Sequence, residues 1–105
     1  MAASYKHLLS PGRIGTMELR NRIFLSPMGS NLAEPDGYCG ERIARYYAAR
    51  AKGGAALVIM GSVGVAYPRG SGNQMQVAVS EDKFIPGLKR VADAVHEHGL
   101  SLIHI

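Results

Sequence analysis

Residues 19–31, LRNRIFLSPMGSN, contain the first strong strand signal in the chain. The apolar run Ile23, Phe24 and Leu25 is typical of a parallel strand that is covered on both faces. The run ends in Ser26-Pro27-Met28-Gly29. Proline has no N–H and fits where strand pairing stops, and glycine lets another group approach the main chain closely. This exit therefore indicates either simple strand termination or a ligand that lies against the backbone.

A helix and a second strand follow. Residues 31–40 read as a loop, because Asp-Gly at 36–37 marks a tight turn. Residues 41–54 predict a helix that the glycines at 53 and 54 end. One helical face collects Ala44, Tyr47, Ala48 and Ala51. Residues 55–65, AALVIMGSVGV, are apolar almost throughout and predict a second buried strand.

Two less regular segments flank these elements. Residues 12–21, GRIGTMELRN, predict a short hairpin with Gly12 and Gly15 as turn residues. Residues 66–80 form a long loop, and loops of this length in compact domains are often functional. Tyr67 and Arg69 in this loop are candidates for a contact with a substrate or with the edge of a cofactor.

The C-terminal third predicts a second helix and a third strand. Ser80 is expected to cap the start of a turn, and Pro86 suits the first helical turn. Gly99 is expected to end the helix, and residues 100–105, LSLIHI, to form the strand. The buried face of the helix is predicted from residues at helical spacing: Ile85, Leu88, Ala92 and Val95.

The order of these elements predicts an α/β fold with a parallel sheet. Such a sheet needs both faces covered, which two helices cannot do for a closed barrel. We therefore predict the N-terminal portion of a (β/α)8 TIM barrel, a fold of about 250 residues. Residues 1–105 would form its first two to three βα units, an incomplete barrel domain. A doubly wound fold is the alternative, but it favours Gly-x-Gly-x-x-Gly after the first strand, and that motif is absent there.

Composition excludes several classes of function. The 105 residues carry a net charge of +4, but the basic residues are scattered and aromatic residues do not interleave with them. We therefore expect no nucleic-acid partner. No apolar run approaches the roughly 20 residues of a membrane span, and the N-terminus is a poor signal peptide. Cys39 is the one cysteine and cannot form an internal disulfide, which indicates a reducing compartment, the cytoplasm.

No cluster of polar residues predicts a metal or a catalytic triad. His96 and His98 are two positions apart on a helix and point in different directions. Glu34 and Asp36 have no third ligand nearby in the sequence, and nothing near Cys39 supports a nucleophile. Asn21 and Arg22 precede the first strand and are predicted to be structural.

Three segments together resemble the old yellow enzyme family of flavin oxidoreductases. They are residues 19–38 (LRNRIFLSPMGSNLAEPDGY), 45–62 (RYYAARAKGGAALVIMGS) and 91–99 (VADAVHEHG). The resemblance covers roughly residues 5–99. Residues 28–33, MGSNLA, are closer to the larger branch, which includes 2-enoate and 2,4-dienoyl-CoA reductases. Members of that branch carry an iron–sulfur cluster and a region that binds FAD and NAD(P)H after the barrel.

The resemblance implies an FMN site at the two strand exits. Residues 26–29 would run beside the isoalloxazine ring, with backbone groups on its polar edge near N5 and O4. The implied cofactor-binding residues are Ser26, Pro27, Met28, Gly29, Gly61 and Ser62. Relatives often have threonine or cysteine at position 29. Because Gly29 has no side chain, tuning of the flavin would fall to its backbone N–H or to Ser30.

The implied reaction passes hydride from NAD(P)H through FMN to the β-carbon of an activated alkene of the enoate, enone or dienoyl type. The family's substrate-binding donors and its proton-donating tyrosine lie further along the barrel. No catalytic residue is therefore expected in this chain, and the chain alone is expected to be inactive. Two alternatives stay open: another barrel enzyme of the aldolase type, or a small basic binding module with salt-dependent affinity for polyanions.

The end of the sequence departs from the family. Relatives continue the third strand into Gln-Leu-x-His-x-Gly-Arg, whose glutamine contacts the flavin. Aligned on Gly99, that glutamine would fall at Ile105. We therefore expect residues 100–105 to be non-native and the natural protein to continue after Gly99.

Overall fold

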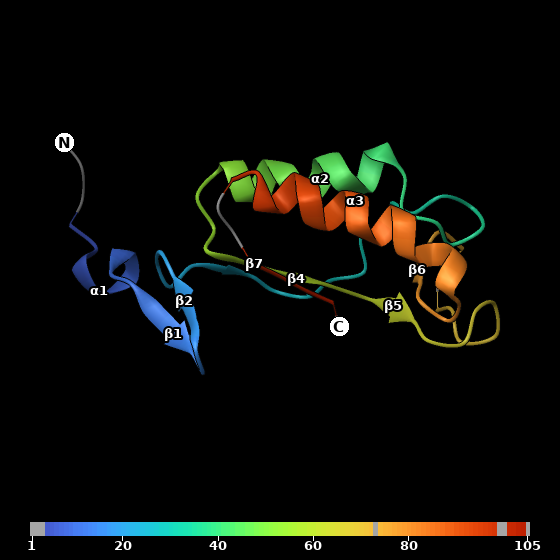
Figure 1. Cartoon of the computed structure of the whole chain (residues 1–105), viewed down its shortest axis with the longest axis horizontal. Helices are drawn as coiled ribbons and strands as arrows, with labels where there is room; N and C mark the ends of the chain where they lie inside the picture. The colour runs from blue at the N-terminus through green and yellow to red at the C-terminus, as the bar shows by residue number, and fades with distance from the viewer. Residues whose placement is uncertain (1–3, 73, 99–100, 105) are drawn as a thin grey trace.

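The computed structural model describes residues 4–72, 74–98 and 101–104. A short N-terminal helix and a hairpin precede the main βα units (Figure 1). The elements are α1 (Lys6–Leu9), β1 (Gly12–Ile14), β2 (Met17–Leu19), β3 (Phe24–Leu25), α2 (Glu41–Lys52), β4 (Leu57–Met60), β5 (Val63–Gly64), β6 (Val77–Ala78), the 3-10 helix η1 (Asp82–Phe84), α3 (Ile85–His96) and β7 (Ser101–His104).

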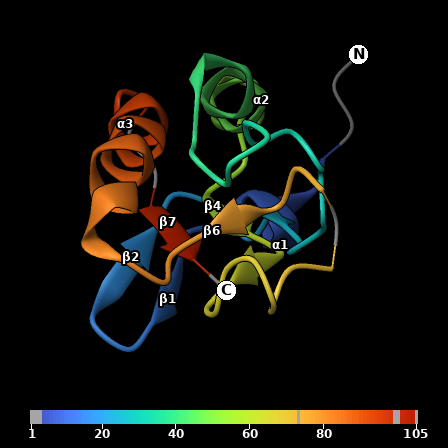
Figure 2. The same ribbon diagram turned by 90° about the vertical axis from the view of Figure 1, so that its right-hand side faces the viewer.

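The central sheet has three parallel strands in the order β3-β4-β7. Phe24 pairs with Leu57, and Leu57 pairs in turn with Ser101. Helix α2 connects β3 to β4, and α3 connects β4 to β7. Both helices lie side by side over one face of this sheet (Figures 1 and 2). The predicted alternation of strands and helices, and the parallel sheet, are therefore confirmed.

The core lies between the two helices and the sheet. Its members are spaced as helical and strand periodicity requires: Ile43, Ala44, Tyr47 and Ala51 from α2, Val58 and Met60 from β4, and Val91 and Val95 from α3. The buried face of α3 passes through Gly87, Val91 and Val95. Ile85 was predicted to lie on that face, but it is 55% exposed. Gly87 takes that place because the main chain of Cys39 approaches so closely that a Cβ would lie 2.8 Å from its carbonyl oxygen.

The first strand is shorter and more exposed than predicted. It spans Phe24 and Leu25 only, and Phe24 is 42% exposed. The prediction of a strand covered on both faces is wrong within the described residues, because β3 is an edge strand here and the helices cover one face of the sheet. The second predicted strand also divides at residues 61 and 62, after which β5 pairs in parallel with β6.

The glycine predictions are confirmed in part. Gly15 lies in the β1–β2 turn with φ +58°, and Gly54 follows α2 with φ +115°. Gly12 was predicted as a turn residue but lies in β1. Pro86 occupies the first turn of α3 as predicted. Gly99, the predicted end of that helix, lies outside the described residues.

Two other predictions concern the C-terminal third of the chain. Ser80 forms no cap. The described residues give its buried hydroxyl no hydrogen-bond partner, and η1 begins after Glu81 without a side-chain cap. The third predicted strand is present at residues 101–104, whereas Leu100 and Ile105 lie outside the described part of the chain.

Polar side chains tie the N-terminal end of the sheet to the C-terminal ends of the helices. Arg20 donates to the carbonyls of Ala51 (2.9 Å), Ala55 (3.2 Å) and His98 (3.0 Å). Asn21 donates to the carbonyl of Gly54 over 2.8 Å. A guanidinium at the negative ends of two helices also interacts favourably with their dipoles. These contacts fit the structural role predicted for Asn21. Arg20 has a similar structural role, which the sequence analysis did not predict.

Helices α2 and α3 are the longest in the described part of the chain, with 12 residues each. In the part of the chain that the structure describes, no helix is both long enough and apolar enough to cross a membrane.

Candidate functional site

The C-terminal ends of β3 and β4 meet at the end of the sheet that lies opposite the β1–β2 hairpin (Figure 1). We call residues 26–29 the first strand exit, and residues 61 and 62 the second strand exit. An isolated parallel bridge joins Gly29 to Gly61. The structure therefore brings together the two segments that the sequence singled out as candidate ligand contacts.

Gly61 allows the two exits to lie against each other. A Cβ on Gly61 would lie 2.8 Å from the Cβ of Pro27 and 3.2 Å from the backbone nitrogen of Met28. Such distances are too short for any residue but glycine without a shift of the backbone. Gly61 is therefore needed for the close packing of the two exits, and the group that it contacts most closely is Pro27.

The first strand exit is open to solvent. Ser26, Pro27, Met28 and Gly29 are exposed, as is Ser62, whereas Gly61 is buried. Met28 is 57% exposed. Residues 26–30 and 61–65 include no charged side chain. The exits therefore offer a ligand neutral main-chain groups, two hydroxyl groups and an apolar methionine, and they offer it no formal charge.

Tyr47 lies behind the exits, and no pattern in the sequence predicts this contact. Its ring is buried in the core, 1% exposed, and its hydroxyl donates to the carbonyl of Gly61 over 3.4 Å. The side chain of Ser30 also interacts with this hydroxyl. Burial raises the pKa of Tyr47. The phenol therefore keeps its proton as a donor at neutral pH.

The long loop after β5 is tied to the loop after β3. The side-chain oxygen of Asn31, whose φ is +55°, accepts from the backbone N–H of Met75 over 2.9 Å. The N–H of Ala33 donates to the carbonyl of Met75 over 3.0 Å. Arg42 of α2 donates to the carbonyl of Ala33 over 3.2 Å. These bonds fix the chain that rims the strand exits.

Tyr67, a candidate ligand contact from the sequence, is engaged within the protein. Its hydroxyl donates to the carbonyl of Pro35 over 3.1 Å. Its ring packs edge-on against Phe84, which also contacts Tyr38. Arg69, the second candidate in this loop, is exposed.

The other chemically active side chains do not gather at the exits. Cys39 is 4% exposed, and burial raises the pKa of its thiol to about 11 against the opposing charge of Arg90. Such a thiol is inert at neutral pH. Among the described residues, no three His, Cys, Asp or Glu side chains lie close enough together to hold a metal ion.

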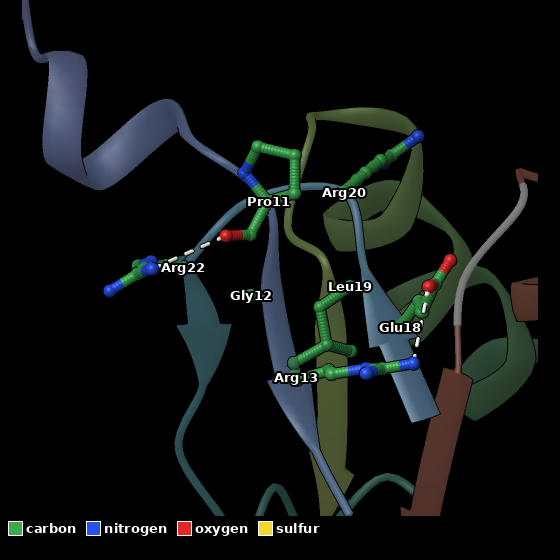
Figure 3. Close-up of a pocket in the computed structure, with 7 residues that line it drawn as sticks. All are labelled: Pro11, Gly12, Arg13, Glu18, Leu19, Arg20 and Arg22. Carbon is green, nitrogen blue, oxygen red and sulfur yellow. Dashed lines mark hydrogen bonds and ion pairs between the residues drawn. The ribbon is translucent and has the colours of Figure 1, made fainter. Parts of the chain in front are cut away.

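A pocket of about 700 Å³ lies at the opposite end of the sheet, beside the hairpin. Figure 3 shows that the guanidinium groups of its three arginines point in different directions. Arg13 pairs with Glu18 at 3.4 Å, Arg22 donates to the carbonyl of Pro11 at 3.3 Å, and Arg20 is held by helix carbonyls. Because these groups do not converge, the pocket does not form an anion site.

The strand exits fit a flat aromatic ring with a polar edge. The exposed residues 26–29 provide main-chain donors and acceptors in an extended segment, and Met28 adds apolar surface beside them. Hydrogen bonds from neutral backbone groups suit the uncharged edge of an isoalloxazine ring.

Comparison with known proteins assigns the family. Residues 7–105 match the NADH:flavin oxidoreductase / NADH oxidase family. The chain is 42% identical over 98 residues to an NADH oxidase of Thermoanaerobacter brockii, covering 93% of this chain and 15% of that protein. It is 32% identical over 101 residues to a multifunctional alkene reductase/demethylase of Caballeronia cordobensis, covering 96% of this chain and 15% of that protein. This chain therefore belongs to the NADH:flavin oxidoreductase family, as its resemblance to the old yellow enzymes indicated.

The solved structures agree. The chain superposes on a 2-naphthoyl-CoA reductase with a TM-score of 0.88 and 30% identity, over 96% of this chain and 15% of that one. The matched old yellow enzymes are (β/α)8 barrels, so the predicted fold class, the N-terminal portion of such a barrel, is confirmed. The chain spans only about 15% of the length of the curated relatives described above.

Proposed function

We propose that this chain is the N-terminal part of the barrel of an FMN-dependent oxidoreductase that reduces activated alkenes with NAD(P)H. Residues 1–105 would supply the first two to three βα units. The observation that carries the proposal is the junction of the two strand exits, where an exposed, uncharged backbone segment lies at the C-terminal end of the sheet. Active sites of (β/α)8 barrels form at this end.

The proposed cofactor-binding residues act through backbone and packing. Ser26, Pro27, Met28 and Gly29 would lie along one side of the ring, with Gly61 and Ser62 next to them. FMN, when bound, supplies the ability to accept hydride from NAD(P)H and to deliver it to the β-carbon of an enone, enoate or dienoyl substrate. Residues 26–29 would orient the ring and exclude water from the side that they cover. The groups that bind the substrate and donate the proton are proposed to come from later barrel strands.

The size of the relatives supports a place in the larger branch of the family. The matched segment is only 15% of the Thermoanaerobacter NADH oxidase, so that protein is far longer than a barrel of about 250 residues. We propose that the full-length protein also carries an iron–sulfur cluster and a region that binds FAD. Iron analysis and flavin extraction of the full-length protein test this extension independently of the FMN site.

The two alternatives find no support at the strand exits. An aldolase of the barrel type commonly uses a lysine at a strand end, and residues 26–30 and 61–65 contain none. A basic binding module needs convergent cations, whereas Arg13, Arg20 and Arg22 point apart and are paired within the protein.

The test uses the full-length protein that contains this chain. We expect the purified protein to be yellow, to release FMN on denaturation, and to oxidise NADH or NADPH faster when an enone or an enoyl-CoA ester is added. A colourless protein that takes up no FMN from solution would contradict the proposal. Tight, salt-dependent binding to a polyanion such as heparin, without flavin binding, would favour the binding module.

A further inference from the structure

In the described residues, the Tyr47 hydroxyl interacts with the second strand exit and with the residue that follows the first strand exit. It donates to the carbonyl of Gly61 in the second strand exit. It also interacts with the side chain of Ser30, which directly follows the first strand exit. Tyr47 itself belongs to helix α2, so one side chain joins the helix layer to both segments of the sheet edge.

The direction of the two bonds follows from the number of protons. A phenol has a single proton, and Tyr47 gives it to the Gly61 carbonyl. In its interaction with Tyr47, the Ser30 hydroxyl can therefore act only as the donor. The donors and acceptors then follow one order, from Ser30 to Tyr47 to Gly61. This series of interactions spans the bridge between Gly29 and Gly61.

The neighbouring Tyr46 provides an internal contrast. It is also on α2, but its ring is half-buried at the edge of the core, and the ring centroid lies 3.7 Å from the Arg50 guanidinium carbon. The two rings touch edge-on with centroids 5.1 Å apart. Packing alone therefore accounts for Tyr46, whereas a phenylalanine at 47 would fill the same space and lose only the contacts with the exits.

We propose that Tyr47 is a positioning residue, whose hydroxyl holds the strand exits in the register that presents their main chain to the flavin. This inference rests on the proposed function. It also answers which group at the first strand exit can tune the flavin. Because Ser30 interacts with Tyr47, we assign that role to the main chain of Gly29, on which Tyr47 acts through the position of the backbone.

The experiment compares Tyr47→Phe with Tyr46→Phe in the full-length FMN-loaded protein. For Tyr47→Phe we expect the Kd of FMN, measured by flavin fluorescence, to rise about five- to tenfold, since one or two modest hydrogen bonds are lost. We also expect the midpoint potential of the bound flavin to shift. Tyr46→Phe is expected to change neither quantity, and both variants are expected to keep the far-UV circular dichroism of the parent.

Ser30→Ala is the second variant. It removes the side chain that interacts with the Tyr47 hydroxyl and leaves the core unchanged. We expect it to shift the midpoint potential in the same direction as Tyr47→Phe. If Tyr47→Phe fails to fold, Ser30→Ala decides. The inference is overturned if the parent binds FMN tightly and both variants match Tyr46→Phe in Kd and potential. A parent that binds no FMN would instead overturn the proposed function, and this inference with it.

Discussion

The two ends of the parallel sheet are built in different ways. At the N-terminal end, the long polar side chains of Arg20 and Asn21 reach out to four backbone carbonyls and tie both helices to the strands. At the C-terminal end, the backbone itself is exposed, and glycine and proline bring the two exits together. Side chains support that end from behind: Tyr47 contacts Gly61, and Asn31 and Arg42 fix the neighbouring loops. One end therefore serves stability, and the other leaves main chain accessible to a ligand.

The difference also explains where side-chain identity matters. Each carbonyl at the N-terminal end needs a donor of the right length, so the demand is for arginine and asparagine. At the strand exits the demand is for small or conformationally restricted residues that let two backbones approach. Substitutions at the first end should act on the free energy of unfolding alone, whereas substitutions at the second should also weaken the affinity for flavin.

The largest effect concerns the stability of the isolated chain, because the contacts at the two ends of the sheet do not cover its exposed apolar surface. Phe24 and Met28 are 42% and 57% exposed, and β3 is an open edge. We expect the 105-residue chain alone to lack a cooperative thermal transition and to aggregate. Calorimetry and light scattering measure this. A sharp, reversible melt with a tightly bound yellow chromophore would show the expectation to be wrong.

The next effect tests the N-terminal end. In the full-length protein, Arg20→Ala removes a charged donor from three carbonyls and should lower the free energy of unfolding by about 2–3 kcal/mol. The matched control is Arg13→Ala, whose pair with Glu18 is largely exposed and should be worth less than about 0.5 kcal/mol. Urea denaturation measures both. If both variants lost the same free energy of unfolding, the Arg20 hydrogen bonds would contribute no more to stability than an exposed surface ion pair.

Gly61→Ala tests the strand exits. Its Cβ would clash with Pro27 and force the exits apart. We expect a loss of about 1–3 kcal/mol in unfolding free energy, typical of overpacking, together with weaker FMN binding. Gly12→Ala at the opposite end is the control, because its Cβ would meet the flexible Arg22 side chain at 3.4 Å. If FMN affinity falls equally in both variants, the exits have no special relation to the flavin.

The smallest effect concerns Cys39, which is buried in the core just before α2. Its pKa rises from 9.0 to about 11 in the folded state. The folded protein thus holds the proton to higher pH than the unfolded chain does. The contribution to stability is complete below pH 9 and is lost as the pH rises toward 11. Cys39→Ala should abolish this part of the alkaline loss in urea titrations at pH 8 to 11.

Labelling provides an independent measure of the same thiol. At pH 8 we expect Cys39 to react about 100-fold more slowly with a maleimide in the native protein than in urea, in line with its smaller thiolate fraction. Equal rates in the two states would mean that the thiol is accessible and that the assigned burial is incorrect.

Periodicity and turn chemistry predicted most of the fold. Tyr47 and Ala51 fall on the buried face of α2, and Gly15 and Gly54 adopt the positive φ that their turns require. The Ile85 prediction failed because a backbone contact, between Gly87 and Cys39, set the rotation of α3. No hydrophobic pattern carries that information. Ser80 failed as a cap because capping depends on loop geometry that lies beyond the local sequence.

The sequence predicted the two segments of the candidate site, but it did not predict that they are joined. The Pro27 and Gly61 signals marked where each strand ends, and resemblance to the family gave them a ligand. The bridge between Gly29 and Gly61, and the Tyr47 hydroxyl behind it, depend on strand register, which a single sequence does not specify. Arg20 was missed for a similar reason, since its partners are carbonyls from 31 to 78 positions away.

The most direct test is a crystal structure of the full-length protein with its flavin. We expect the isoalloxazine ring to lie against the main chain of residues 27–29, with a backbone donor of that segment within about 3.2 Å of a ring heteroatom. A ring bound elsewhere, with residues 26–29 and 61–62 facing only solvent or protein, would contradict the assignment of the site.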